Sequence, residues 1–213
     1  MEQTSKGATR IQPPGVRPVA GNGGQALFAF LLDTLKGQGD TVTHSVATKG
    51  QHLPFVLGVQ TPSGERLGLA IYAFPISMEP GPRFAFLADL GGERCGTESL
   101  WKDPYGVMQT HLVGIDIEQG VIVGADAVYN DPLTSPTRFA FSNNEMDAIR
   151  SRGWHAWEHE PDDATPGLEP PIEILVGFRA QHLLNYLRYE REAQGEDPGH
   201  RHLLAERFAP TQL

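Results

Sequence analysis

The sequence has few means of cross-linking or anchoring itself. Its single cysteine, Cys95, rules out a disulfide within the chain and fits a reducing compartment. Cys95 stands in the polar stretch GGERCGTES without an activating neighbour, which favours an inert loop thiol over a nucleophile. No window approaches the roughly 18 apolar residues of a membrane span, and the N-terminus lacks the apolar core of a signal peptide. We therefore expect a cytoplasmic protein with no membrane partner.

Positive charge is also scarce. The chain has 17 lysines and arginines against 26 aspartates and glutamates, which gives a formal net charge of −9. Such a charge repels phosphate at long range. A nucleic-acid partner would therefore have to be held by a local basic patch.

The common nucleotide-binding and nucleophile motifs are missing. The sequence has no Walker loop, no dinucleotide-binding fingerprint and no G-x-S-x-G. Nothing in it therefore supports a nucleotide cofactor or a nucleophilic hydrolase, and we expect no cofactor.

One motif does match a metal site. His155, Glu158 and His159 fit the H-x-x-E-H of inverted zinc peptidases, in which a helix places both histidines on one face. Gly153 precedes the motif and Pro161 follows it, so the segment is too short for such a helix. We predict an aromatic edge strand here, and no metal site.

Two aspartates follow apolar strands. Asp116 and Asp126 could hold Mg²⁺ for phosphodiester cleavage if they met at one edge of a sheet. Nucleases of the restriction-enzyme fold also need a lysine two residues beyond the second acid, and Val128 stands there. We therefore predict that both aspartates cap turns.

Hydrophobic spacing divides the chain into a flexible N-terminal arm, residues 1–23, and a single α+β domain, residues 24–213. Strands that come mostly as hairpins favour a mixed, largely antiparallel sheet or partial barrel with flanking helices. The predicted strands are 53–60, 67–74, 83–87, 107–116, 120–125, 138–141 and 172–178. The predicted helices are 24–36, 144–152, 179–193 and 199–207, and Ser142 or Asn143 should cap the second of them.

Aromatic and basic residues are the remaining candidates for a functional surface. Aromatic rings can stack on an unpaired base, and arginine or lysine can bind phosphate. The predicted nucleic-acid-binding residues are Trp101, Lys102, Tyr105, Arg138, Arg150, Arg152, Trp154 and Trp157. The alternative for Trp154 and Trp157 is that they fill the core.

The order of several segments is similar to a known module. DPYGVMQTHLVGIDIEQGVIVGADAVYNDP is followed by SPTRFAFSN, GWHAWE, a strand and the helical NYLRYEREAQGEDPGHRHLLAER. Over about residues 50–207 this resembles the N-terminal recognition-type module of prokaryotic restriction endonuclease-like proteins of genome defence. The resemblance implies a role in recognising DNA, beside a nuclease domain or partner subunit. The chain departs from that pattern because it ends where a nuclease domain would begin.

Three functions stay open at this point. The first is a non-catalytic domain of a restriction or defence system that recognises nucleic acid, including modified DNA. The second is a protein–protein interaction or regulatory subunit that binds no nucleic acid, which the acidic charge favours. The third is an unrecognised hydrolase or nuclease.

Overall fold

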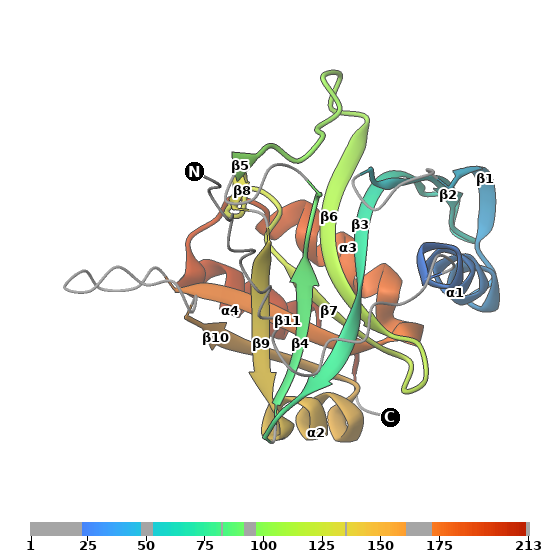
Figure 1. The fold of residues 1–213 in the computed structure, drawn as a ribbon. Coiled ribbons are helices and arrows are strands. Elements are labelled where there is room, and N and C mark those ends of the chain that lie inside the picture. Colours follow the sequence, from blue (N-terminus) through green and yellow to red (C-terminus); the bar gives the residue numbers. More distant parts are fainter. Residues whose placement is uncertain are drawn as a thin grey trace, which may run out of the picture.

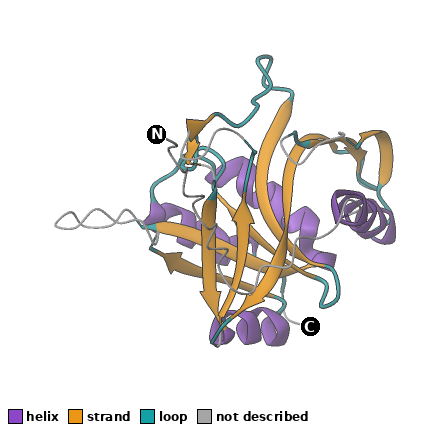
Figure 2. Ribbon diagram, viewed as in Figure 1, coloured by secondary structure: helices purple, strands orange, loops and turns teal. Residues whose placement is uncertain are grey.

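A computed structural model describes residues 23–47, 53–81, 83–91, 97–134, 136–160 and 172–211. Its helices are α1 (Gly23–Gly37), α2 (Asn143–Arg152), α3 (Leu183–Ala193) and α4 (Pro198–Phe208), with a 3-10 turn η1 (Ala180–His182) before α3. Its strands are β1 (Thr41–Val46), β2 (Phe55–Gln60), β3 (Arg66–Glu79), β4 (Arg83–Ala88), β5 (Thr97–Glu98), β6 (Met108–Asp116), β7 (Val121–Ala125), β8 (Leu133–Thr134), β9 (Thr137–Ser142), β10 (Trp154–His159) and β11 (Glu173–Arg179). Figures 1 and 2 show the arrangement.

A nine-stranded sheet organises the fold. Seven strands follow the order β1-β2-β3-β6-β7-β11-β10. The C-terminal half of β3 also pairs with β4, and β4 pairs with β9. The pairs are antiparallel except for β3 with β6. The prediction of an α+β fold with a mixed, largely antiparallel sheet is confirmed, and the sheet stays open instead of closing into a barrel.

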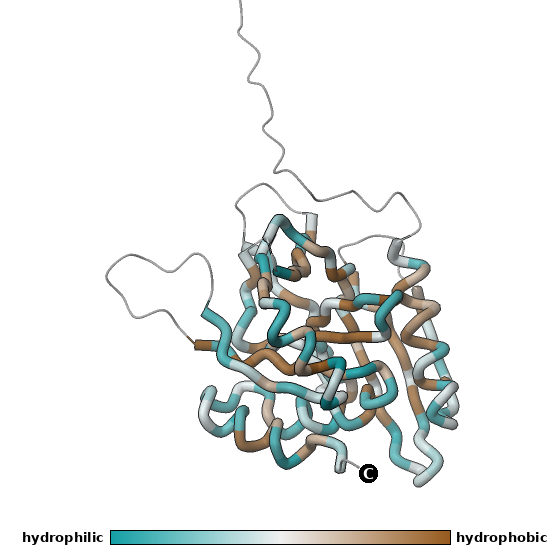
Figure 3. Tube along the Cα trace, turned by 90° about the horizontal axis from the view of Figure 1, so that it is seen from below, coloured by the Kyte–Doolittle hydropathy of each residue, from teal (hydrophilic) through white to brown (hydrophobic). Residues whose placement is uncertain are grey.

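Helices α1, α3 and α4 cover one face of this sheet. The three-to-four spacing of Leu27, Leu31 and Leu35 places these leucines on one side of α1, and all three are buried. On α3, Leu183 and Leu187 are buried in the same cluster. In Figure 3 the hydrophobic residues concentrate along the interior strands, whereas the turns are hydrophilic.

The other face is covered by β4, β9 and α2. Paired phenylalanines from β4 and β9 stack over it, with the rings of Phe86 and Phe139 centred 4.6 Å apart. Gly114 on β6 is required below them, because an added Cβ would lie 2.3 Å from the ring of Phe86. The sheet therefore has a hydrophobic core on each side.

Helix α2 has complete caps. Ser142 accepts a hydrogen bond from the backbone N–H of Asn144, and Glu145 accepts one from the backbone N–H of Ser142, which together form a capping box. Gly153 ends the helix with a φ of 78°, a conformation that favours glycine. The predicted Ser142 cap is confirmed.

Several predicted boundaries were incomplete. Strand β1 was missed because TVTHSV is exposed almost throughout and has no apolar alternation. Strand β3 runs beyond the predicted 67–74, since it pairs first with β2 and β6 and then with β4. The predicted 1–23 arm, apart from Gly23, and Cys95 lie outside the described residues. In the part of the chain that the structure describes, no helix is long and apolar enough to cross a membrane.

Candidate functional site

Five of the residues predicted to bind nucleic acid lie at two separate ends of the molecule: Trp101, Lys102 and Tyr105 at one, and Arg150 and Arg152 at the other. Strand β6 runs nine residues from the loop that carries Trp101 to the turn beside α2, a length of about 26 Å. We call these the loop end and the α2 end. They cannot belong to a single pocket.

The loop end displays exposed aromatic side chains. The side chain of Asp103 organises the 101–107 loop, because its oxygens accept hydrogen bonds from the backbone N–H groups of Tyr105, Val107 and Met108. These bonds lower the pKa of Asp103. Tyr105 is 87% exposed and Val107 72%. The loop, which projects beyond the sheet in Figure 1, thus presents apolar surface on an ordered backbone.

Two of the predicted cations are neutralised by acids. The ammonium group of Lys102 lies 2.6 Å from Asp131, which joins the loop to the segment before β8. Arg138, on the outer face of β9, donates through Nε to Glu79 at 2.9 Å and pairs with it through a second nitrogen. Neither cation therefore offers a full positive charge to a phosphate.

Three arginines gather at the α2 end. Arg150 pairs with Asp147 at 3.1 Å and donates to the side chain of Gln119. Arg179 donates to the carbonyl oxygen of Arg150 at 3.1 Å, and among the described residues neither Arg179 nor the exposed Arg152 forms an ion pair. Two of the three arginines at this end therefore have no ion-pair partner among the described residues, while the acids Asp116, Glu118 and Asp147 lie close by.

The pKa values of two histidines at this end are shifted by burial and by the charges around them. Burial lowers the pKa of His155, the positive charge of Arg152 lowers it further, and the negative charge of Glu145 opposes the shift. Burial and Arg179 likewise lower the pKa of His182. Cations that disfavour protonation of nearby imidazoles also attract phosphate.

The two tryptophans of β10 differ in access. Trp154 is 6% exposed, packs on Phe178 and Tyr189, and donates through Nε1 to the carbonyl oxygen of Ala205. Its face cannot meet a base in this structure. Trp157 is partly exposed and packs between Phe141 and His155. Trp154 is therefore a core residue, which was the alternative to a role in binding nucleic acid.

The H-x-x-E-H segment forms strand β10, at the edge of the sheet, as predicted. In a strand, His155 and His159 are about 13 Å apart, too far to share one metal ion. The group of side chains that could hold a metal among the described residues is Glu196, Asp197 and His200, all exposed. Asp197 already caps α4 by accepting from the N–H of His200.

The two strand-end aspartates do not meet either. Asp116 accepts from the backbone N–H of Gln119 and so caps the β6–β7 turn. Asp126 accepts from the N–H of Val128, which also confirms a turn cap. Asp116 pairs with Val121 at the start of β7. Asp126 lies five residues further along the chain, about 16 Å from that pair. A shared Mg²⁺ site is excluded in this structure.

Asp126 belongs to a buried ionic cluster that the sequence did not reveal. Arg201 of α4 contacts Asp126 at 2.9 Å and Glu190 of α3 at 2.7 Å, and all three side chains are 2–3% exposed. Glu173 accepts from the backbone N–H of Asp126 and from the side chain of Asn130. No sequence pattern marks these partners, because they lie on four separate elements.

The cluster holds more acid than base. Burial raises the pKa of Glu173 to about 8, although the hydrogen bonds from Asp126 and Asn130 oppose the shift. Burial also raises the pKa of Glu190, against the opposing charge of Arg201. The cluster ties α3 and α4 to the ends of β7 and β11 and leaves little room for a substrate, since the adjoining cavity has a volume of only about 20 Å³.

A larger pocket lies at the α2 end. It has a volume of about 380 Å³ and is bordered by the start of α1, the second half of β3, β4 and the β6–β7 turn. Gln119, which lines it, is held by Arg150. Arg150 and this pocket are therefore adjacent.

The fold is an α+β domain that exposes aromatic side chains at one end and arginines at the other. The chain belongs to the family described as Methylase-associated X1, whose sequence profile matches residues 67–187. No curated protein and no solved structure matches the chain.

Proposed function

We propose that this chain is a non-catalytic DNA-recognition module of a restriction-modification system and that its α2 end binds the phosphate backbone. The observation that carries the proposal is the exposure of Arg152 and Arg179, which form no ion pair among the described residues, beside the half-exposed Arg150. Membership of a methylase-associated family supports the setting, because DNA methylation is the partner reaction of restriction.

The buried acids of the Arg201 cluster also favour a recognition role over a catalytic one. The acids whose pKa is raised most by burial, Glu173 and Glu190, form hydrogen bonds or ion pairs inside the protein. General acids and bases must reach a substrate. Arg152 and Arg179, in contrast, are exposed and can contact phosphate without rearrangement.

The 101–107 loop supports a second function, docking to a protein partner such as a methylase or nuclease subunit. Tyr105 and Val107 are exposed on a loop that Asp103 holds in place. Aromatic side chains on an ordered loop lose little entropy on binding, and tyrosine is enriched among residues that dominate protein interfaces. Docking at the loop end is compatible with DNA at the α2 end.

Fluorescence anisotropy of labelled duplexes across a salt series tests the DNA proposal. Each phosphate contact contributes about 0.9 to the slope of log affinity against log salt. We expect Arg152→Ala to lower that slope by about 0.9. The control is Arg191→Ala, which removes an exposed arginine in the last turn of α3, away from the α2 end. Arg191 pairs with Glu65, and its loss should leave the slope unchanged.

Two outcomes would contradict the proposal. One is that the folded wild-type protein binds no duplex or single strand even at low salt. The other is that Arg152→Ala and Arg191→Ala change the slope equally. If Tyr105→Ala then weakens binding to a methylase or nuclease subunit, the docking function stands in its place.

A further inference from the structure

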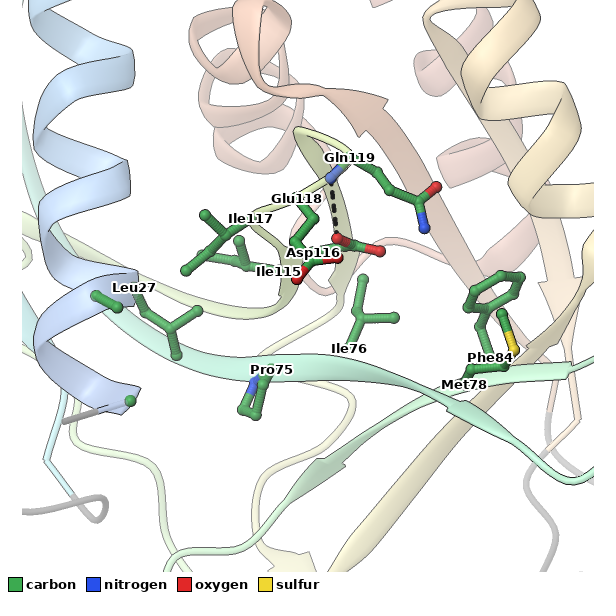
Figure 4. Close-up of a pocket in the computed structure, with 12 residues that line it drawn as sticks. Leu27, Pro75, Ile76, Met78, Phe84, Ile115, Asp116, Ile117, Glu118 and Gln119 are labelled. Atoms are coloured by element: carbon green, nitrogen blue, oxygen red, sulfur yellow. Dashed lines mark hydrogen bonds between the residues drawn. The ribbon is translucent and has the colours of Figure 1, made fainter. Parts of the chain in front are cut away.

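The pocket at the α2 end has the size of a small-molecule site. Its volume of about 380 Å³ falls within the range of ligand pockets, roughly 300–1,000 Å³. The residues that line it are Gly23, Ala26, Leu27, Pro75, Ile76, Met78, Phe84, Ile115, Asp116, Ile117, Glu118 and Gln119. Figure 4 shows them around the open space.

Apolar side chains from α1, β3 and β6 line this pocket. In Figure 4, Leu27 of α1 lies at the left, Ile76 of β3 near the centre, and Ile115 of β6 between them. Walls of this kind favour a ligand with apolar faces over a compact, fully hydrated ion.

One carboxylate supplies a fixed hydrogen-bond acceptor. Oδ1 of Asp116 accepts from the backbone N–H of Gln119 at 3.0 Å, which orients the group. Among the described residues, its other oxygen accepts no hydrogen bond, and the carboxylate lies between Ile76 and Gln119 in Figure 4. A ligand with an N–H donor on its edge can therefore bind there.

Arg150 lies beside the pocket, whose lining also includes the acids Asp116 and Glu118. The guanidinium of Arg150 donates to the side chain of Gln119 and lies 5.9 Å from the ring centre of Phe84, and both of these residues line the pocket. A phosphate bound at Arg150 would thus hold the attached nucleotide at the opening. A nucleotide has all three features that this site would bind: a base with apolar faces, an N–H donor on the edge of that base, and a phosphate attached through the sugar.

We propose that this pocket receives an unpaired base that carries an exocyclic amino group, namely adenine, cytosine or guanine, with the amino group donating to Asp116. The inference rests on the proposed DNA recognition and specifies which bases the protein distinguishes. Carboxylates accept hydrogen bonds from such amino groups, whereas thymine has no amino group, and its single N–H donor on that edge lies between two carbonyl oxygens that the carboxylate repels. Enzymes that act on bases extrude them into pockets in the same way.

Duplexes with one base opposite an abasic site test this proposal, because that base is already unpaired. Anisotropy should show that wild-type protein binds duplexes with adenine, cytosine or guanine at that position about tenfold more tightly than the duplex with thymine. Ile76→Trp, which fills the pocket, and Asp116→Asn, which replaces an acceptor oxygen by a donor, should both abolish the preference. The affinity of Ile76→Trp for a fully paired duplex should not change, and that of Asp116→Asn, which loses one negative charge, should not fall.

The control is Asp147→Asn, which removes an exposed acid that pairs with Arg150 but does not line the pocket. It should keep the preference. The proposal is overturned if wild-type protein shows no preference, or if the preference survives in both pocket variants while circular dichroism shows that they are folded.

Failure of the pocket and failure of DNA recognition can be told apart. If no duplex binds at all, DNA recognition fails, and free nucleosides still test the pocket. In that case deoxyadenosine, deoxycytidine and deoxyguanosine should shift the NMR methyl signals of Ile76 and Ile115 more than thymidine does. Equal shifts, or none, would overturn the pocket as well.

Discussion

Replacing Arg201 by methionine should lower the free energy of unfolding by about 3–5 kcal/mol, because it leaves the buried carboxylates of Asp126 and Glu190 without their cation. The carbonyl oxygen of Ala193 also loses a donor, which lies 2.7 Å away. For a chain of this length, such a loss lowers the melting temperature by about 10 °C. Differential scanning calorimetry and chemical unfolding both measure it.

A matched control lies on the same helix. Arg207 pairs with Glu192 at the surface, and its side chain is 58% exposed. Surface pairs contribute about 0–1 kcal/mol, so Arg207→Met should have little effect. Adding Glu190→Gln to Arg201→Met should recover part of the loss, since it removes one uncompensated buried charge. Equal effects of Arg201→Met and Arg207→Met would show that the buried cluster does not stabilise the fold.

The stability should also fall as the pH rises from 6.5 to 8. The pKa of Glu173 is raised to about 8 in the folded state, whereas the unfolded carboxyl has a pKa near 4.5. In this range the folded state holds a proton that the unfolded state has released, so raising the pH favours unfolding. One proton corresponds to about 1.4 kcal/mol per pH unit, or about 2 kcal/mol over the range. Glu190, whose pKa burial also raises, adds to the fall.

Below pH 6.5 a buried histidine acts in the opposite direction. Burial lowers the pKa of His111 to about 3, so between pH 6.5 and 3 only the unfolded state takes up its proton and acid favours unfolding. Most of the histidine contribution is complete at pH 7, because the unfolded imidazole is half protonated at pH 6.5 and nearly neutral at pH 7.5, so the acids dominate between pH 7 and 8. Glu173→Gln keeps an acceptor oxygen for Asp126 and Asn130 and should flatten the fall. Glu192→Gln, at an exposed position, should not. An unchanged slope in Glu173→Gln would contradict the assigned pKa.

The sequence predicted most elements of the fold because their signals are local. The leucine spacing of α1, the Thr61-Pro62-Ser63-Gly64 turn between β2 and β3 and the Ser142 cap each specify structure within a few residues. The parallel pairing of β3 with β6 was not predictable in this way. Its register, Gly68 opposite Met108 at one end and Pro75 opposite Ile115 at the other, depends on packing between segments 40 residues apart.

The candidate site was predictable only in part. Sequence reasoning identified Arg150 and Arg152, which do lie together at the α2 end. It did not identify Arg179, which joins them because the end of β11 meets the end of α2. It also grouped them with Trp101 and Tyr105, although the length of β6 separates the two sets. Composition indicates which side chains are present, whereas topology decides which of them meet.

Photo-crosslinking of a duplex to the folded protein, followed by mass spectrometry, tests the central claim most directly. A photoreactive group on the phosphate backbone should attach to the α2 end, on peptides that contain Arg150, Arg152 or Arg179, and Arg152→Ala should reduce the yield. The loop end and the Arg191 region should be labelled weakly. Labelling confined to the 101–107 loop, or no labelling at low salt, would contradict DNA recognition by the α2 end.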